Sequence, residues 1–258
     1  MKISMLLTKN HRLLSIVAAV DMFETVNKYL IESGKPSMFE IDFIGTDTHS
    51  NVQEHTSLLP FVPIAAAKAV SDLIFVPAFA SAAMQENIAA NKVFIPYLHT
   101  QYAQGASLIS FCTGSFLLAA SGLLNGRAAT THVEAADKFA QNFPEVLLQP
   151  HAIVTESGNI YTSGGATSSF HLKLYLIQKF CGRDIAVRTA KNFAIDLDRN
   201  NQLYFDQFKP DLSDDDDLVR MVQMFINERL SEIKNVEEAL DEVPSSRRNI
   251  IRRFKQAT

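Results

Sequence analysis

Residues 110–132 have the sequence SFCTGSFLLAASGLLNGRAATTH, and this stretch decides the fold. Residues 108–111 have the apolar character of a buried strand, and residues 115–123 that of a buried helix. Cys112 therefore lies where a strand gives way to a helix, a turn that exposes a nucleophile above a sheet. Gly114 avoids a Cβ clash in that turn. Because a helix N-terminus favours the thiolate, we predict a lowered pKa for Cys112; a buried structural cysteine is the alternative.

His132 is the candidate partner of this cysteine. If the two residues follow adjacent strands of one parallel sheet, they meet at its carboxyl edge, where open α/β sheets bind ligands. An imidazole there would orient the thiol or accept its proton, whereas the alternative is a purely structural histidine. Glu24 is a candidate carboxylate for completing a triad, and it is equally compatible with an exposed helix position.

Short apolar runs alternate with longer amphipathic stretches through the first two thirds of the chain. Strands are predicted at 3–7, 39–44, 73–76 and 108–111, and helices at 13–31, 82–104, 115–123 and 167–180. Strands without polar alternation are typical of a parallel sheet that is buried on both faces. The βαβ order predicts an α/β protein with a doubly wound parallel sheet. Residues 152–162 are expected to form a hairpin.

The character of the chain changes near residue 196. Residues 196–210, DLDRNNQLYFDQFKP, have the polar texture of a linker. Ser213, followed by four aspartates at 214–217, is typical of a helix N-cap with carboxylates at the positive end of the helix dipole. An acidic binding tail is the alternative.

Three short helices are predicted after this cap. The second is expected to end at Pro244, and Ser245 or Ser246 is expected to cap the third. The apolar residues expected to face inward are Leu218, Met221, Val222, Phe225, Ile226 and Leu230 in the first helix, Val236, Ala239 and Leu240 in the second, and Ile250, Ile251 and Phe254 in the third.

The third helix is basic and contains no carboxylate. Its cations are Arg247, Arg248, Arg252, Arg253 and Lys255. Short helices joined by a tight turn, the last of them basic, are typical of a helix-turn-helix that binds DNA. The alternative is a basic helix face that only contacts solvent.

Composition narrows the class of protein. The 258 residues are 47% hydrophobic and 20% charged, as in ordinary globular proteins. The net charge of −4 means that any contact with DNA must be a local patch. Two cysteines, Cys112 and Cys181, are too few for a disulfide framework and favour a cytoplasmic location.

No targeting or membrane segment is expected. The N-terminal MKISMLL is too short an apolar run for a secretory signal. Residues 105–124 carry no charge, but their serines and glycines favour a buried strand that turns into a buried helix over a membrane span. The histidines show no metal-ligand spacing, so we expect no metal and no cofactor.

The elbow SFCTGSFLLAASGLLNGRAATTH and the downstream stretch NIYTSGGATSSFHLKLYLIQ, residues 159–178, resemble the class I glutamine-amidotransferase-like domain of the ThiJ/PfpI superfamily. The resemblance implies a flavodoxin-like fold, with Cys112 at the nucleophile position and His132 at the partner position. The tail, with its Ser245-Ser246-Arg247 and Arg252-Arg253-Phe254-Lys255, is similar to the start of an AraC-type DNA-binding domain. The two halves occur together in one family of transcription regulators.

The sequence departs from the family pattern at several positions. Ser110 replaces the glycine that opens the amidotransferase elbow, Val133 replaces an aromatic residue, and His171 stands where an acidic residue is usual. The family's carboxylate aligns with either Glu24 or Ser15, so a complete triad is not supported. The tail matches one of the two helix-turn-helix units that such domains carry, with a turn before Ser246 that is one or two residues short.

The resemblance implies a transcription regulator with a 1–195 effector-sensing domain, a 196–212 linker and a 213–258 partial helix-turn-helix. The sensing domain would bind a small metabolite, often a nitrogen-containing one in this family, at the carboxyl edge of the sheet. One helix-turn-helix unit would bind DNA weakly and with a steep salt dependence, and a homodimer would recover affinity. The alternatives are a cysteine-dependent hydrolase or glyoxalase-like enzyme that uses Cys112 and His132, and a regulator in which Cys112 senses oxidation.

Overall fold

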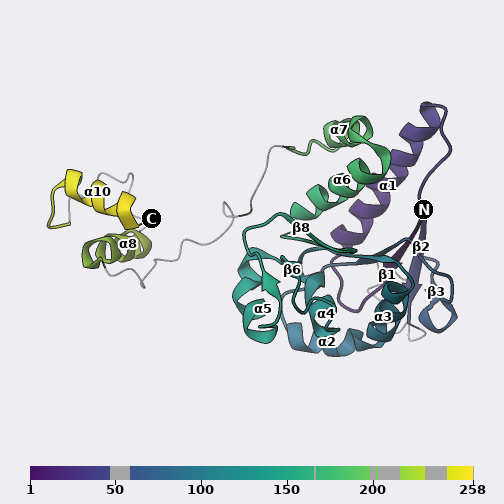
Figure 1. The fold of residues 1–258 in the computed structure, drawn as a ribbon, viewed down its shortest axis with the longest axis horizontal. Helices are drawn as coiled ribbons and strands as arrows, with labels where there is room; N and C mark the ends of the chain where they lie inside the picture. The colour runs from purple at the N-terminus through teal and green to yellow at the C-terminus, as the bar shows by residue number, and fades with distance from the viewer. Residues whose placement is uncertain (47–58, 166, 198–201, 203–215, 230–242, 258) are drawn as a thin grey trace. The chain divides into compact units, whose positions relative to one another are not determined.

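The computed structural model describes residues 1–46, 59–165, 167–197, 202, 216–229 and 243–257. The chain divides into two units, Met1–Phe205 and Asp206–Thr258 (Figure 1). The predictions at Ser213, at Leu230 and for a helix at 236–240 lie outside the described residues. The predicted domain extents of 1–195 and 213–258 stay a prediction, although the first unit extends beyond residue 195.

A seven-stranded sheet forms the centre of the first unit, with the order β3-β2-β1-β4-β5-β9-β8. The strands are β1 (Lys2–Leu6), β2 (Glu40–Gly45), β3 (Val62–Pro63), β4 (Leu73–Val76), β5 (Ser107–Ser110), β8 (Val154–Ser157) and β9 (Ile160–Ser163). Every neighbouring pair is parallel except β8 and β9, which form the predicted hairpin. The doubly wound, flavodoxin-like fold is therefore confirmed. Two short strands, β6 (Ala128–Ala129) and β7 (Leu147–Leu148), form a separate parallel pair.

Helices cover both faces of the sheet. The helices are α1 (Leu13–Glu32), α2 (Met84–Asn91), α3 (Ile95–Ala103), α4 (Ser115–Ala120), α5 (Ala136–Asn142), α6 (Ser168–Cys181) and α7 (Arg183–Asn192). In Figure 1, α1, α6 and α7 lie on one face and α2, α3, α4 and α5 on the other.

The strand β4 shows why the sheet needs both layers of helices. All four of its residues are buried, and because side chains alternate along a strand, they divide between two cores. Leu73 and Phe75 pack in the core that contains α1, α6 and α7, whereas Ile74 and Val76 pack in the core on the other face. The uninterrupted apolar sequence of β4 is therefore explained by its burial on both faces of the sheet.

The single helix predicted at 82–104 is wrong. The structure has α2, a turn of 3₁₀ helix at Lys92–Phe94 and then α3, in which Pro96 occupies the first turn. Proline lacks a backbone N–H and is tolerated at the start of a helix but not in its interior, so it marks a new helix. No predicted helix corresponds to α7, which Gly182, at φ +88°, separates from α6.

Residues 105–124 form β5, a turn and α4, as predicted. Within the described residues, no helix is both long enough and apolar enough to cross a membrane.

The second unit packs α8 (Asp217–Arg229) against α10 (Arg247–Ala257). Its core consists of buried and half-buried side chains from both helices and from the residue before Pro244. These are Leu218, Val222, Ile226, Val243, Ile250 and Phe254. The predicted inward positions are wrong for Met221 and Ile251, whose side chains are 49% and 43% exposed. Val219, which was not predicted to face inward, is buried at 1% exposure, so the buried face of α8 is shifted relative to the prediction.

Side-chain caps begin both helices of the second unit. Asp216 Oδ1 accepts hydrogen bonds from the backbone N–H of Leu218 at 3.0 Å and of Val219 at 3.1 Å. The helix α8 begins at Asp217, so Asp216 occupies its N-cap position. Ser246 Oγ accepts from the N–H of Asn249 at 3.4 Å, which confirms the predicted cap of α10.

Candidate functional site

Cys112 follows β5 and has a left-handed backbone conformation, with φ of +53°. Such a conformation is strained in a residue with a Cβ and persists only where the surroundings hold it in place. The Cys112 N–H donates to Ser163 Oγ at 3.3 Å, and the Cys112 carbonyl accepts from Ser115 Oγ at 3.0 Å and from Thr131 Oγ1 at 3.4 Å. The backbone of Cys112 is thus held by Ser115 and Thr131 of the elbow and by Ser163 of β9.

Gly114 avoids a Cβ clash in the elbow, as predicted. Its own φ is −57°, an ordinary helical value, so the turn does not depend on the conformational freedom of glycine there. A Cβ on Gly114 would instead lie 2.6 Å from the Pro77 carbonyl oxygen and 2.7 Å from that of Val76. Glycine is needed because the elbow packs directly on the backbone at the end of β4.

Burial raises the pKa of the Cys112 thiol to about 11. The thiol's hydrogen bonds with Thr113 and the positive charge of Arg12 act in the opposite direction, but the desolvation of a side chain that is only 7% exposed outweighs them. The lowered pKa predicted from the helix N-terminus is therefore wrong. The helix that follows, α4, spans six residues and does not offset the desolvation.

The sequence predicted that Cys112 and His132 could follow adjacent strands of one sheet. His132 does not follow a strand adjacent to β5. It follows β6, which belongs to the separate two-stranded sheet, while β5 pairs with β4 and β9. The Nδ1 atom of His132 accepts a hydrogen bond from the backbone N–H of Glu134 at 3.2 Å. Among the described residues, no hydrogen bond joins Cys112 to His132.

A cavity of about 810 Å³ nevertheless brings Cys112 and His132 together. It lies at the carboxyl ends of β4 and β5 and at the start of α1, the edge where the sequence placed the pocket. Its walls are mainly apolar and aromatic, with charged side chains from three segments. The lining residues are Arg12, Leu13, Leu14, Ser15, Ala78, Phe79, Ser81, Ala82, Met84, Phe111, Cys112, Thr113, Phe116, His132, Glu134, Ala135, Lys138 and Ser169.

The structure decides between the two alignments of the family's carboxylate. Glu24 is exposed on α1 and does not line the cavity, so it is not the third member of a triad. Ser15 does line it, and its hydroxyl donates to the Arg12 carbonyl at 2.7 Å and accepts from the Ala78 N–H at 3.2 Å. The acidic lining residue is Glu134, which the sequence analysis missed because no local pattern distinguishes it from a surface glutamate.

Lys173 is a second charged group that the sequence analysis missed. Its side chain on α6 is fully buried, and Nζ donates to Ser169 Oγ at 3.1 Å and to the Ser169 carbonyl at 3.3 Å. The Nζ atom also lies 4.2 Å from the ring centroid of Phe111, the residue before Cys112. Burial lowers the pKa of Lys173 to about 7.

His171, at the position usually acidic in the family, lies elsewhere. Its Nε2 lies 2.8 Å from the carbonyl oxygen of Asp196, and its Nδ1 lies 3.3 Å from that of Thr167. It is not among the lining residues of the cavity. His171 thus connects the chain after α7 to α6.

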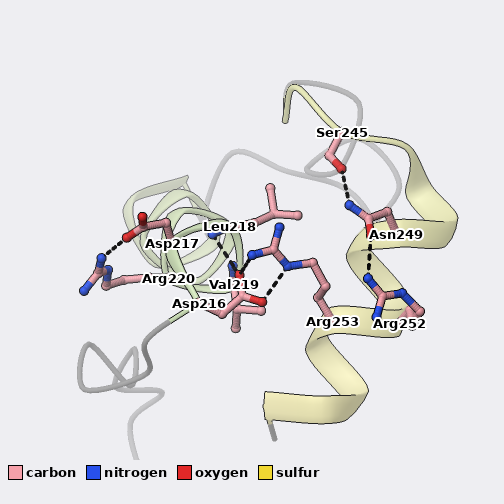
Figure 2. A network of polar contacts seen from close by, with 9 residues as sticks. All are labelled: Asp216, Asp217, Leu218, Val219, Arg220, Ser245, Asn249, Arg252 and Arg253. Atoms are coloured by element: carbon pink, nitrogen blue, oxygen red, sulfur yellow. Dashed lines mark hydrogen bonds and ion pairs between the residues drawn. The ribbon is translucent and has the colours of Figure 1, made fainter.

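The basic residues of α10 differ in their roles. Arg247, Arg248 and Arg252 are exposed, and Arg252 donates to Asn249 Oδ1 at 3.0 Å. Arg253 instead forms an ion pair with Asp216 at the start of α8 at 2.5 Å (Figure 2). The side chain of Lys255 lies outside the described part of the structure. Arg253 therefore connects α10 to α8 through Asp216.

A flavodoxin-like sheet with a strained cysteine just after its strand β5 defines a nucleophile-elbow protein of the α/β class. The chain belongs to the DJ-1/PfpI family, whose model matches residues 1–179.

Named relatives include both regulators and enzymes. The chain is 33% identical over 131 residues to the HTH-type transcriptional regulator CdhR of Pseudomonas aeruginosa, a match that covers 51% of this chain and 38% of CdhR. It is 32% identical over 117 residues to the isonitrile hydratase of Pseudomonas putida, and this match covers 45% of this chain and 48% of the hydratase. The chain thus spans less than half the length of either relative.

Among solved structures, an AraC family transcriptional regulator from Pseudomonas putida superposes with a TM-score of 0.59 at 19% identity. The superposition covers 74% of this chain and 98% of that one. At 19% identity, this similarity shows that the two proteins share a fold.

Proposed function

We propose that the protein is a transcription regulator in which the DJ-1/PfpI domain senses a small molecule and the helical unit binds DNA. The observation that carries the proposal is the exposure of Arg247, Arg248 and Arg252 on α10, in a unit separate from that domain. Exposed arginines near the start of the second helix of a helix-turn-helix are placed to contact DNA. The identity with the regulator CdhR supports this function.

The cavity beside Cys112 is the proposed effector site. Its volume of about 810 Å³ falls within the range of small-molecule sites in proteins. The aromatic side chains of Phe79, Phe111 and Phe116 would bury an apolar or cationic group, and Arg12 and Glu134 would orient a polar one. These side chains suit a small metabolite of mixed polarity, including a nitrogen-containing one. A cytoplasmic location and a homodimer that presents two helical units to DNA complete this proposal.

The second candidate function is a cysteine-dependent enzyme. The identity with an isonitrile hydratase and the strained backbone at Cys112 favour it. The raised pKa of the thiol and the absence of a hydrogen bond from Cys112 to His132 in the described residues count against it, since a nucleophile needs a thiolate or an adjacent base. Turnover of an amide or of a 2-oxoaldehyde, abolished by Cys112→Ser, would establish the enzyme in place of the sensor.

DNA binding is tested on the full chain with a fluorescently labelled duplex of mixed sequence at low salt. The double variant Arg247→Glu/Arg248→Glu is compared with Arg183→Glu, which reverses an exposed charge on α7 of the first unit. We expect the double variant to lose binding and the control to retain it. Each lost phosphate contact should reduce the slope of log K against log salt by about 1. Equal binding by the wild type and the double variant would contradict the proposal.

A further inference from the structure

Gln202 lies in the stretch that the sequence predicted to be a linker, yet its side chain is buried. Its exposed fraction is 1%, and it belongs to the first unit. Asp206, the first residue of the second unit, follows shortly after it along the chain. A buried amide in such a segment calls for a physical explanation, because burying an amide costs free energy unless it is hydrogen-bonded.

Both the oxygen and the nitrogen of the Gln202 side-chain amide form hydrogen bonds. Its Oε1 accepts from the Gly165 N–H at 2.9 Å, and its Nε2 donates to the Pro150 carbonyl at 2.6 Å and to the Thr131 carbonyl at 3.0 Å. The backbone N–H of Gln202 donates to the His151 carbonyl at 3.0 Å. Further contacts of Nε2, with Thr130 Oγ1 and the Ala152 carbonyl, are both 3.3 Å. Gln202 thus connects three loops of the first unit.

The receiving site is shaped for this side chain. A Cβ on Gly164 would lie 2.2 Å from Oε1 of Gln202, so only glycine leaves the space that the amide occupies. The donors and acceptors also match an amide specifically, because a carboxylate has no proton for the carbonyls of Pro150 and Thr131.

One of the three loops lines the cavity through His132, and a second, at Gly165, packs against this histidine. Thr131 directly precedes His132 and donates through Oγ1 to the Cys112 carbonyl at 3.4 Å. A Cβ on Gly165 would lie 3.2 Å from Cδ2 of His132, so the backbone beside Gln202 is packed on the imidazole. A movement of His132 therefore displaces the groups that hold Gln202.

We propose that Gln202 is a positioning residue that couples the occupancy of the cavity to the anchoring of the chain at Gln202, shortly before the second unit begins. A ligand that shifts His132 changes the hydrogen bonds of Gln202. The regulatory use of this coupling rests on the proposed function, whereas the coupling itself is a property of the first unit. The tests below read the coupling alone, so their failure is distinguishable from a failure to bind DNA.

The first test measures amide hydrogen exchange at Gly165 in the full chain. Gln202→Ala removes the acceptor of this N–H, and we expect its exchange to become at least tenfold faster. The matched control is Gln149→Ala, which removes an exposed glutamine beside Pro150 and should leave the exchange at Gly165 unchanged. Equal exchange at Gly165 in the wild type and in Gln202→Ala would overturn the proposal.

A second variant separates hydrogen bonding from shape. Gln202→Glu keeps the size of the side chain but places a carboxylate against the carbonyl oxygens of Pro150 and Thr131. We expect exchange at Gly165 to be accelerated at neutral pH as it is in Gln202→Ala, with partial recovery at a pH where the glutamate is protonated and donates again. Wild-type exchange at neutral pH in this variant would contradict the assigned contacts.

The third test needs no substitution at Gln202. Alkylating Cys112 with iodoacetamide at alkaline pH places a carbamidomethyl group in the cavity, as a probe of occupancy. By linkage, if the two sites are coupled, this modification must change the exchange of the Gly165 and Gln202 amides, and we expect at least a threefold change. Cys112→Ser treated in the same way controls for alkylation at Cys181. Unchanged exchange at both amides in the alkylated wild type would overturn the coupling.

Discussion

Arg253 on α10 and Asp216 at the start of α8 form an ion pair, with Nη2 of the arginine 2.5 Å from Oδ1 of the aspartate (Figure 2). The same carboxylate caps α8 through the backbone N–H groups of Leu218 and Val219. One side chain therefore begins a helix and holds a second helix against it, so the stability of the helical unit should depend on this pair.

We predict that Asp216→Asn lowers the melting temperature of the helical unit, because asparagine can still cap α8 but cannot pair with Arg253. Arg253→Ala should have a similar effect, and the double variant should lose little more, since both single variants remove the same contact. The control is Asp217→Asn, which removes a carboxylate that is 83% exposed and pairs with Arg220 on its own helix. Additive losses in the double variant would argue against the pair.

The pair also predicts a dependence of stability on pH. The hydrogen bond from Arg253 holds the pKa of Asp216 below its ordinary value of 3.8. The stabilisation is therefore fully present above pH 3.8 and is lost as the pH falls through the lower pKa of the folded state. Thermal melts of the wild type and of Asp216→Asn should converge in acid and differ at neutral pH. A constant difference at all pH values would contradict this assignment.

The raised pKa of Cys112 predicts slow alkylation. With a pKa of about 11, the thiolate fraction at pH 8 should be roughly two hundredfold below that of a free thiol, and the rate should continue to rise up to the pKa. Iodoacetamide kinetics against pH, followed by mass spectrometry at Cys112, measure this rate. His132→Ala should not change the profile, because no hydrogen bond of the described residues joins the two side chains. A fast reaction at neutral pH that depends on His132 would favour the enzyme.

Because Lys173 is buried, we predict that the stability of the protein increases with pH. Its pKa of about 7 in the folded protein lies below the ordinary value of 10.5, so the unfolded chain binds more protons between these values. The free energy of unfolding should therefore increase from pH 7 to pH 9, by up to about 1.4 kcal/mol per pH unit. Lys173→Met should abolish this slope, while Lys191→Met, at an exposed position on α7, should retain it. Parallel pH profiles of the wild type and Lys173→Met would refute the prediction.

Alanine substitutions at two glycines of the elbow should reduce stability by different amounts. A methyl group at Gly114 would meet the backbone oxygens of Val76 and Pro77, so Gly114→Ala should cost about 3 kcal/mol. Gly122, at φ +78°, has open space around it, and Gly122→Ala should cost only about 1 kcal/mol of backbone strain. Urea denaturation of the two variants measures the difference, and equal losses would show that close packing at Gly114 is not the reason for glycine.

Ser110 replaces the family's glycine just before the elbow, and its hydroxyl is buried without a hydrogen-bond partner among the described residues. Removing an unpaired buried hydroxyl should stabilise the protein, so we expect Ser110→Ala to gain about 1 kcal/mol. Ser163→Ala provides the contrast, because it removes the acceptor of the Cys112 N–H and should lose about 1 kcal/mol. A loss in Ser110→Ala would indicate that the hydroxyl has a partner.

The sequence by itself determined the parts of the fold that depend on neighbouring residues. The apolar run at β4, the amphipathic period of α1 and the Ser246 cap of α10 are each contained within one short segment. Their structures follow from local geometry and from which faces are apolar. The order of these elements then predicted the doubly wound sheet, and the elbow sequence placed Cys112 at the edge of the cavity.

Only the tertiary structure decided what each side chain of the site contacts. The pKa of Cys112 depends on how completely distant segments exclude water from its thiol. Arg253 forms an ion pair with Asp216 at the start of another helix. His132 reaches the cavity from a different sheet, and Gln202, in a predicted linker, is buried among three loops. The burial of a side chain and its polar partners depend on residues far apart in the chain. The sequence pattern of one segment therefore cannot predict them.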